Sequence, residues 1–167
     1  MVEVDIVALA LRYVHIASGI AWIGAVMYSV GVLRFTFPRA DPPAARGVLR
    51  RMLPVVRRYV PAAAVLTIGF GALLYLYMGV FNPAILLNSL WGQLLLIALG
   101  LAVGVFVYGL IWGLGTAGRL LPHFEEEKEE HMEEVMALTR RFNRVQVVIL
   151  LVGLVIIGLM VYVTGTL

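Results

Sequence analysis

The sequence predicts an all-α fold: an integral membrane four-helix bundle with an amphipathic helix in a cytoplasmic loop. Of its 167 residues, 62% are hydrophobic, whereas soluble domains are about 45–50% apolar. Four segments also reach the length of about 20 apolar residues that a transmembrane helix requires. We expect one membrane domain, residues 1–167, with spans at about 6–33, 60–81, 92–117 and 145–165.

The positive charges indicate how these spans are oriented. Twelve of the thirteen Lys and Arg residues lie in two long connections on the same side of the predicted spans, and Arg12 is the exception. The positive-inside rule makes that side cytoplasmic. Both termini are then expected outside a plasma membrane that the chain crosses several times. Because the cations lie beside membrane spans, their expected partner is the lipid bilayer, and the basic composition does not indicate nucleic-acid binding.

Both charged connections contain predicted helices. Residues 44–59 have the pattern of an interfacial helix interrupted at Pro54, whose arginines are expected to reach anionic lipid head groups. Residues 123–143 have a strongly polar helical pattern. We expect this second segment to extend the third or the fourth span into the cytoplasm.

The first span carries a polar stripe. Arg12, His15, Gly19 and Trp22 recur at spacings of three and four, which places them on one helical face. Polar groups at membrane depth usually face a bundle interior, a cavity or a ligand, because exposing them to lipid is costly. His15 is the only histidine in any predicted span, and a neutral imidazole is a common ligand of haem and of metals.

Two interpretations of this stripe remain open. In the first, His15 is an axial ligand of haem b, Arg12 pairs with a propionate, Gly19 leaves room for close approach and Trp22 stacks on the porphyrin edge. In the second, His15 hydrogen-bonds across helices, and Arg12 extends its charged end to the outer interface.

The second ligand of such a site is not evident, because the other three spans contain no histidine. Met78 and Met160 near the outward ends of the second and fourth spans are candidates. A five-coordinate haem and a haem shared by the His15 residues of two protomers, which requires a homo-oligomer, are the alternatives. A copper ion held by His15 with either methionine is chemically suitable as well.

The first span resembles one found in a superfamily of small membrane proteins, which includes the copper-resistance protein D family and the HemJ-type protoporphyrinogen IX oxidases. Its pattern is His-x-x-x-Gly-x-x-Trp-x-Gly, matched here by His15, Gly19, Trp22 and Gly24.

Two further segments resemble this superfamily at the entries to its second and third helices. They are Arg-Arg-Tyr-Val-Pro at 57–61 and Trp-Gly-Gln-Leu-Leu at 91–95, so that the resemblance covers roughly residues 10–117. It implies a four-helix membrane bundle that binds haem b or handles copper, with His15 as the ligand. Oxidase-type members carry a lysine early in the third helix and further histidines. Residues 93–117 contain neither, which argues against oxidase activity.

A second candidate metal site lies in the acidic part of the later connection. Imidazole and carboxylate groups recur there at spacings of four, four and three, so that one helical face with His123, Glu127, His131 and Glu134 has suitable ligands for Zn²⁺ or a related divalent ion. The alternative is a solvated helix, in which acidic residues favour the helix start and pair with nearby arginines.

Three functions therefore follow as expectations. The first is a membrane-embedded, haem b-binding redox or cofactor-handling protein. The others are a copper-handling membrane protein and a non-catalytic partner subunit. The sequence contains no phosphate-binding loop, nucleophile elbow or metalloprotease motif, so the question of enzymatic activity stays open.

Overall fold

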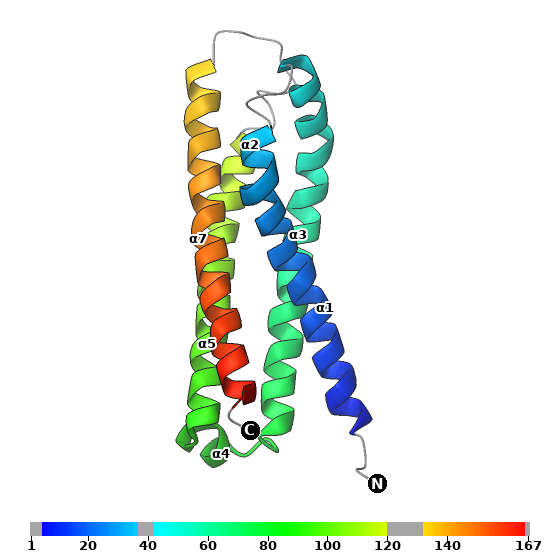
Figure 1. Cartoon of the computed structure of the whole chain (residues 1–167), viewed down its shortest axis with the longest axis vertical. Helices are drawn as coiled ribbons and strands as arrows, with labels where there is room; N and C mark the ends of the chain where they lie inside the picture. Colours follow the sequence, from blue (N-terminus) through cyan, green and yellow to red (C-terminus); the bar gives the residue numbers. More distant parts are fainter. Residues whose placement is uncertain (1–4, 37–41, 120–131, 166–167) are drawn as a thin grey trace.

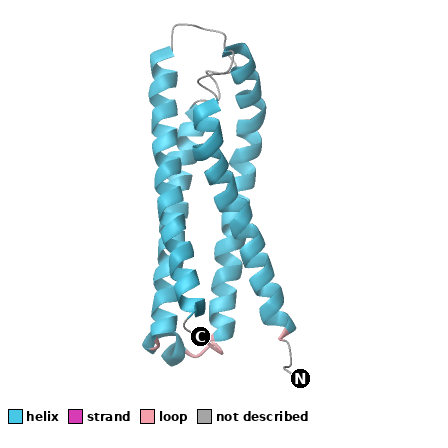
Figure 2. Ribbon diagram, viewed as in Figure 1, coloured by secondary structure: helices cyan, strands magenta, loops and turns pink. Residues whose placement is uncertain are grey.

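The computed structural model describes residues 5–36, 42–119 and 132–165, without the side chains of 42–46, 132–135 and 164. Every regular element in this part of the chain is helical (Figures 1 and 2). Two π-helical segments, η1 and η3, interrupt the α-helical pattern. In chain order the elements are α1 (Ile6–Tyr28), η1 (Ser29–Leu33), α2 (Arg34–Thr36), α3 (Pro42–Met78), α4 (Pro83–Asn88), α5 (Leu90–Tyr108), η3 (Gly109–Leu114) and α7 (Met132–Gly165).

Four helical stretches are long and apolar enough to cross a membrane, which confirms the number of spans expected from the sequence. Their bounds are Ile6–Thr36, Gly47–Met78, Leu90–Arg119 and Met136–Val163. α1 begins and α7 ends at the same end of the bundle, which we call the terminal end (Figure 1). We call the opposite end, where α3 and α7 begin, the loop end.

The segment predicted as a separate interfacial helix is instead the beginning of α3. That helix has 37 residues and runs without a break through Pro54 and Pro61, so the interruption expected at Pro54 is absent. The physical reason is packing, because Leu53 is buried against Ala117 and Leu138 at the loop end. This burial holds the helix together although each proline lacks a backbone donor. The polar segment from Met132 onward likewise belongs to α7, as expected for an extension of the fourth span.

The helices associate as two pairs that share one core. α1 packs along α3, and α5 packs along α7. Toward the terminal end α1 leans away from α7 (Figure 1). In the middle of the bundle all four long helices contribute buried side chains: Trp22, Val26, Ala63, Ala64, Val105, Val145 and Ile149.

Tight contacts around Leu86 close the connection between α3 and α5. Leu86 is buried, and its carbonyl oxygen accepts a hydrogen bond of 3.0 Å from the Tyr75 hydroxyl. A Cβ atom at Gly79 or Gly92 would collide with Leu86. Only glycine fits at these two positions, and their small size allows α4 to fold back beneath the bundle.

Candidate functional site at His15

His15 is anchored to the neighbouring helix by a hydrogen bond to its backbone. Its Nδ1 atom lies 2.8 Å from the carbonyl oxygen of Thr67 on α3. A carbonyl oxygen can only accept, so Nδ1 carries the proton and donates it. In the neutral imidazole this tautomer leaves a lone pair on Nε2. Ligand histidines in metal sites are commonly oriented in this way, with the second ring nitrogen bonded to a carbonyl or carboxylate.

A glycine on α3 makes room for the imidazole. A Cβ atom at Gly71 would lie 2.8 Å from both Nδ1 and Cε1 of His15, closer than a real contact allows. This edge of the ring is therefore pressed against the α3 backbone. The three ring atoms nearest to this Cβ position are Cε1, Nδ1 and Cγ, so Nε2 lies on the part of the ring that is farther from Gly71. His15 itself is half-buried, so its ring is fixed on one side only.

Gly19 and Thr67 extend this contact by one helical turn. A Cβ atom at Gly19 would lie 3.5 Å from Cγ2 of Thr67. The hydroxyl of Thr67 donates to the carbonyl oxygen of Ala63 at 2.7 Å, which satisfies it within its own helix. The structure thus uses Gly19 for close packing of α1 on α3.

The other two members of the predicted stripe lie apart from this contact. Arg12 is exposed one turn toward the terminal end. Trp22 is 5% exposed and belongs to the four-helix core. The stripe therefore divides into an exposed cation, an imidazole anchored to α3 and a buried aromatic residue.

The two methionines proposed as partners occupy other levels of the bundle. Met78 is the last residue of α3. It lies seven residues beyond Gly71, about 10 Å of helix rise, and 40% of its surface is exposed. Met160 is half-buried on α7. It lies seven residues beyond Gly153, where a Cβ atom would meet the side chain of Ile23.

The second predicted metal site falls almost entirely outside the described residues. This applies to His123, Glu127 and His131, while Glu134 lies in α7 without a described side chain. Within the described ranges, no group of three or more His, Cys, Asp or Glu residues is placed to hold a metal ion.

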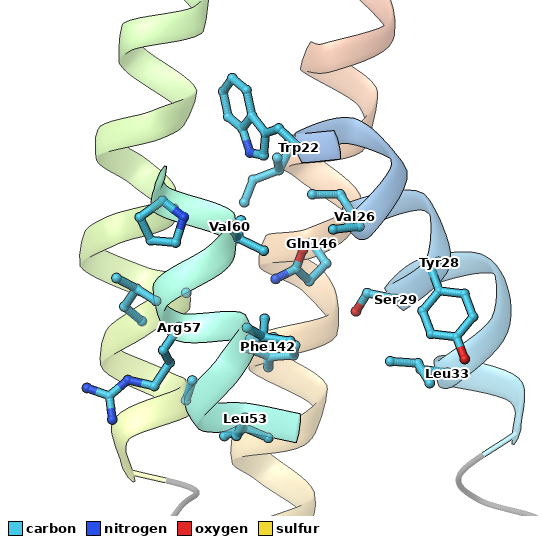
Figure 3. A pocket seen from close by; sticks show the side chains of 18 of the residues that line it. Trp22, Val26, Tyr28, Ser29, Leu33, Leu53, Arg57, Val60, Phe142 and Gln146 are labelled. Carbon is cyan, nitrogen blue, oxygen red and sulfur yellow. The ribbon is translucent and has the colours of Figure 1, made fainter. Parts of the chain in front are cut away.

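The structure also contains a cavity that the sequence did not predict. Its volume is about 260 Å³, and it lies between the four long helices in the loop-end half (Figure 3). Trp22 forms part of its wall, whereas His15 does not. Ser29 and Gln146, two isolated polar residues in apolar spans, point into it. Such residues usually face an interior space, and this is the signal for the cavity that the sequence contains.

Comparison with protein-family models gives no match for this chain. Neither curated proteins nor solved structures match it. The function must therefore be inferred from the geometry of these two regions and from the sequence pattern.

Proposed function

We propose that the four long helices cross a membrane with the loop end on the cytoplasmic side. The four apolar stretches support the crossings, and the arginine-rich connections at the loop end support the orientation. Arg12 then lies near the outer surface, where its exposed guanidinium reaches the polar head groups.

We further propose that the protein binds haem b in the membrane, with His15 Nε2 as an axial ligand. The observation that carries this proposal is the hydrogen bond from His15 Nδ1 to the Thr67 carbonyl oxygen. That bond selects the tautomer with a free Nε2 lone pair and restricts rotation of the ring. Both properties prepare an imidazole for metal ligation, because no proton must be displaced and little side-chain freedom is lost.

The surrounding residues fit a haem to different degrees. Arg12, exposed one turn away on the same helix, suits a propionate group near the outer surface. Gly19 and Trp22 pack α1 against its neighbours, so their proposed role is to hold His15 in place. Haem supplies one-electron chemistry when it is bound, while the chain provides the ligand, the apolar surroundings and the charge near the propionates.

The placement of Met78 supports haem over a copper ion shared by His15 and Met78. Copper requires its ligands to converge on one ion, whereas about 10 Å of helix rise separates Met78 from the turn that contacts His15. The described spans contain no second histidine. The stoichiometry of binding therefore distinguishes one haem per chain from one haem shared by two His15 residues.

The experiment is a haemin titration of the purified protein in detergent. We expect a saturable Soret band that His15→Ala removes. In His15→Gly, added imidazole should restore the band, because it replaces the missing ligand without altering the backbone. The matched controls are His123→Ala and His131→Ala, which should bind like the wild type. Equal binding by wild type and His15→Ala would contradict the proposal.

A further inference from the structure

The cavity in the loop-end half is bounded by irregular backbone on two sides. Both π-helical segments contribute to its wall. Single π-helical turns are rare and occur frequently at functional sites. Irregular backbone at membrane depth is tolerated where it is buried in protein or lines a cavity. The coincidence of two such features around one space indicates that the cavity belongs to the architecture of the bundle.

The cavity is long and narrow. Along α1 and the segments that follow it, the lining residues extend from Trp22 to Arg34, about 18 Å of helix rise. A volume of about 260 Å³ spread over that length suits a single flexible chain and not a planar macrocycle. The deep end is closed by Trp22, Val26 and Ala64, all of them buried. Tyr28 is 54% exposed, so the cavity reaches the surface of the bundle.

Hydrogen-bonding groups gather away from this deep end. Figure 3 shows Ser29 on η1 and Gln146 on α7, with both side chains in the space between the helices. Asn143 lies about one turn nearer the loop end on the same helix as Gln146. Within the described residues, the Gln146 amide forms no hydrogen bond with the protein. A half-buried amide that lines a cavity and has no protein partner has donors and an acceptor available for a polar ligand atom.

The charge of the wall is positive. Arg34 and Arg57 line the cavity, and its described lining contains no Asp or Glu. The Arg57 guanidinium lies toward Gly118, where a Cβ atom would be 3.9 Å from Nη2. This places the charge toward the loop end and away from Trp22. A ligand that complements this gradient has an apolar tail and an anionic head.

We propose that the cavity binds a single-chain amphiphile with a carboxylate head, of the fatty-acid class. The tail lies between the four helices and ends near Trp22. The carboxylate accepts hydrogen bonds from Ser29 and Gln146 and faces the positive charge of Arg57. This site is separate from the one at His15, and its occupation does not require haem.

The test uses Trp22 as a reporter of the tail. The chain has three tryptophans, so the double substitution Trp91→Phe and Trp112→Phe leaves Trp22 alone. Decanoic acid brominated at its terminal carbon is titrated into this variant in detergent, because Ser29 and Trp22 are about 10 Å apart along the helix. We expect saturable quenching of Trp22 that unlabelled decanoic acid reverses and its methyl ester does not. A variant that retains only Trp112, which is 43% exposed and lies outside the cavity wall, should show unsaturated quenching from partition alone.

Substitutions then test the proposed head-group contacts. Gln146→Leu keeps the approximate size but removes the amide, and we expect affinity for the acid to fall roughly tenfold. Arg57→Gln should weaken it about two- to fivefold, as expected for an exposed charge. Arg58→Gln is the matched control, because Arg58 is the next residue, also exposed and not part of the wall.

Three results would overturn the proposal. One is unsaturable quenching of Trp22, which means partition into the micelle only. Another is equal competition by decanoic acid and its methyl ester, which would show that the site does not recognise the anionic head. The third is competition by a two-chain anionic phospholipid that exceeds competition by the acid, which assigns the cavity to a membrane lipid. The same variants are also titrated with haemin. This second titration distinguishes failure of the fatty-acid proposal from failure of the haem proposal at His15.

Discussion

The two halves of the bundle solve the same packing problem differently. In the terminal half, α1 approaches α3 so closely that an imidazole lies directly on a glycine. In the loop-end half, the helices remain apart around a cavity of about 260 Å³, and two of them change to π-helical turns beside it. In the terminal half, a glycine lets α1 and α3 approach each other closely around the His15 side chain. In the loop-end half, π-helical turns lie beside an open space between the helices. The first half thus holds one side chain in a fixed orientation, whereas the second leaves a cavity between the helices.

The largest expected effect comes from filling the glycine contact. In Gly71→Ala, the added Cβ would lie 2.8 Å from the His15 ring, which must move and lose its bond to Thr67. We expect a loss of about 1–3 kcal/mol in the free energy of unfolding in detergent. Haemin affinity should fall about 10–100-fold.

Gly69→Ala is the matched control for this substitution. Gly69 lies on the same helix, but a Cβ there meets nothing within 4 Å. We expect no loss of stability and unchanged haemin affinity. Equal effects of the two substitutions would mean that the His15 contact has no special role.

In the other half, Gln146→Leu should act in the opposite direction. Removing an amide that lacks a protein partner should raise the stability of the ligand-free protein by up to about 1 kcal/mol. Gln93→Leu is the comparison, since its amide donates a 2.9 Å hydrogen bond to the Leu87 carbonyl and its loss should destabilise slightly. Thermal unfolding of both variants in one detergent measures the difference. Destabilisation by Gln146→Leu would show that the amide is already satisfied.

Arg141→Gln should have a smaller effect at the loop end. The Arg141 guanidinium lies 4.6 Å from the centre of the Trp112 ring, and an exposed cation–π contact contributes about 0.5–1 kcal/mol. We expect a loss of this size with unchanged binding of haemin and of the fatty acid. The Trp112 emission spectrum should shift at the same time. A change in ligand affinity would instead link this contact to one of the two sites.

The smallest expected effect is a pH dependence at the terminal end. Asp5 accepts hydrogen bonds from the Ala8 backbone N–H at 3.0 Å and from the Tyr77 hydroxyl at 2.9 Å. Both favour the carboxylate, and the Ala8 bond contributes most to lowering the pKa of Asp5 below its ordinary value of 3.8. The resulting stabilisation is present above that value and is lost as the pH falls through the lower folded pKa.

Unfolding midpoints of wild type and Asp5→Asn across this acidic range provide the measurement. We expect the two curves to converge as the pH decreases, because a protonated Asp5 no longer differs in charge from Asn. In Tyr77→Phe, Asp5 keeps its hydrogen bond from Ala8 and loses the one from Tyr77, which lowers its pKa less. The separation of the curves should therefore decrease but not vanish. Parallel curves would mean that the carboxylate does not stabilise α1.

Particular residues show what the sequence could predict. The four long apolar helices followed from apolar length, and their number is confirmed. Pro54 suggested a break in a separate helix, but α3 continues because Leu53 is buried against two other helices. A single proline is local information, whereas that burial depends on residues distant in the chain.

The candidate site was predictable only in part. His15 stood out as a lone histidine in an apolar span. Its anchor is a backbone carbonyl 52 residues away, and a carbonyl has no signature in the sequence. The cavity was missed for a related reason, because a π-helical turn reflects hydrogen-bond register and not residue type. Ser29 and Gln146 were its polar traces within the spans predicted from the sequence.

The central claim is that His15 presents Nε2 to a haem while Thr67 holds Nδ1. Nitrogen-15 NMR of the histidine rings, recorded before and after addition of haemin, tests this directly. The chain has three histidines, so His123→Gln with His131→Gln leaves His15 as the only signal. The expected result is a neutral ring protonated at Nδ1, whose Nε2 resonance is lost or strongly shifted by haemin. A ring protonated at Nε2, or one unaffected by haemin, would contradict the account.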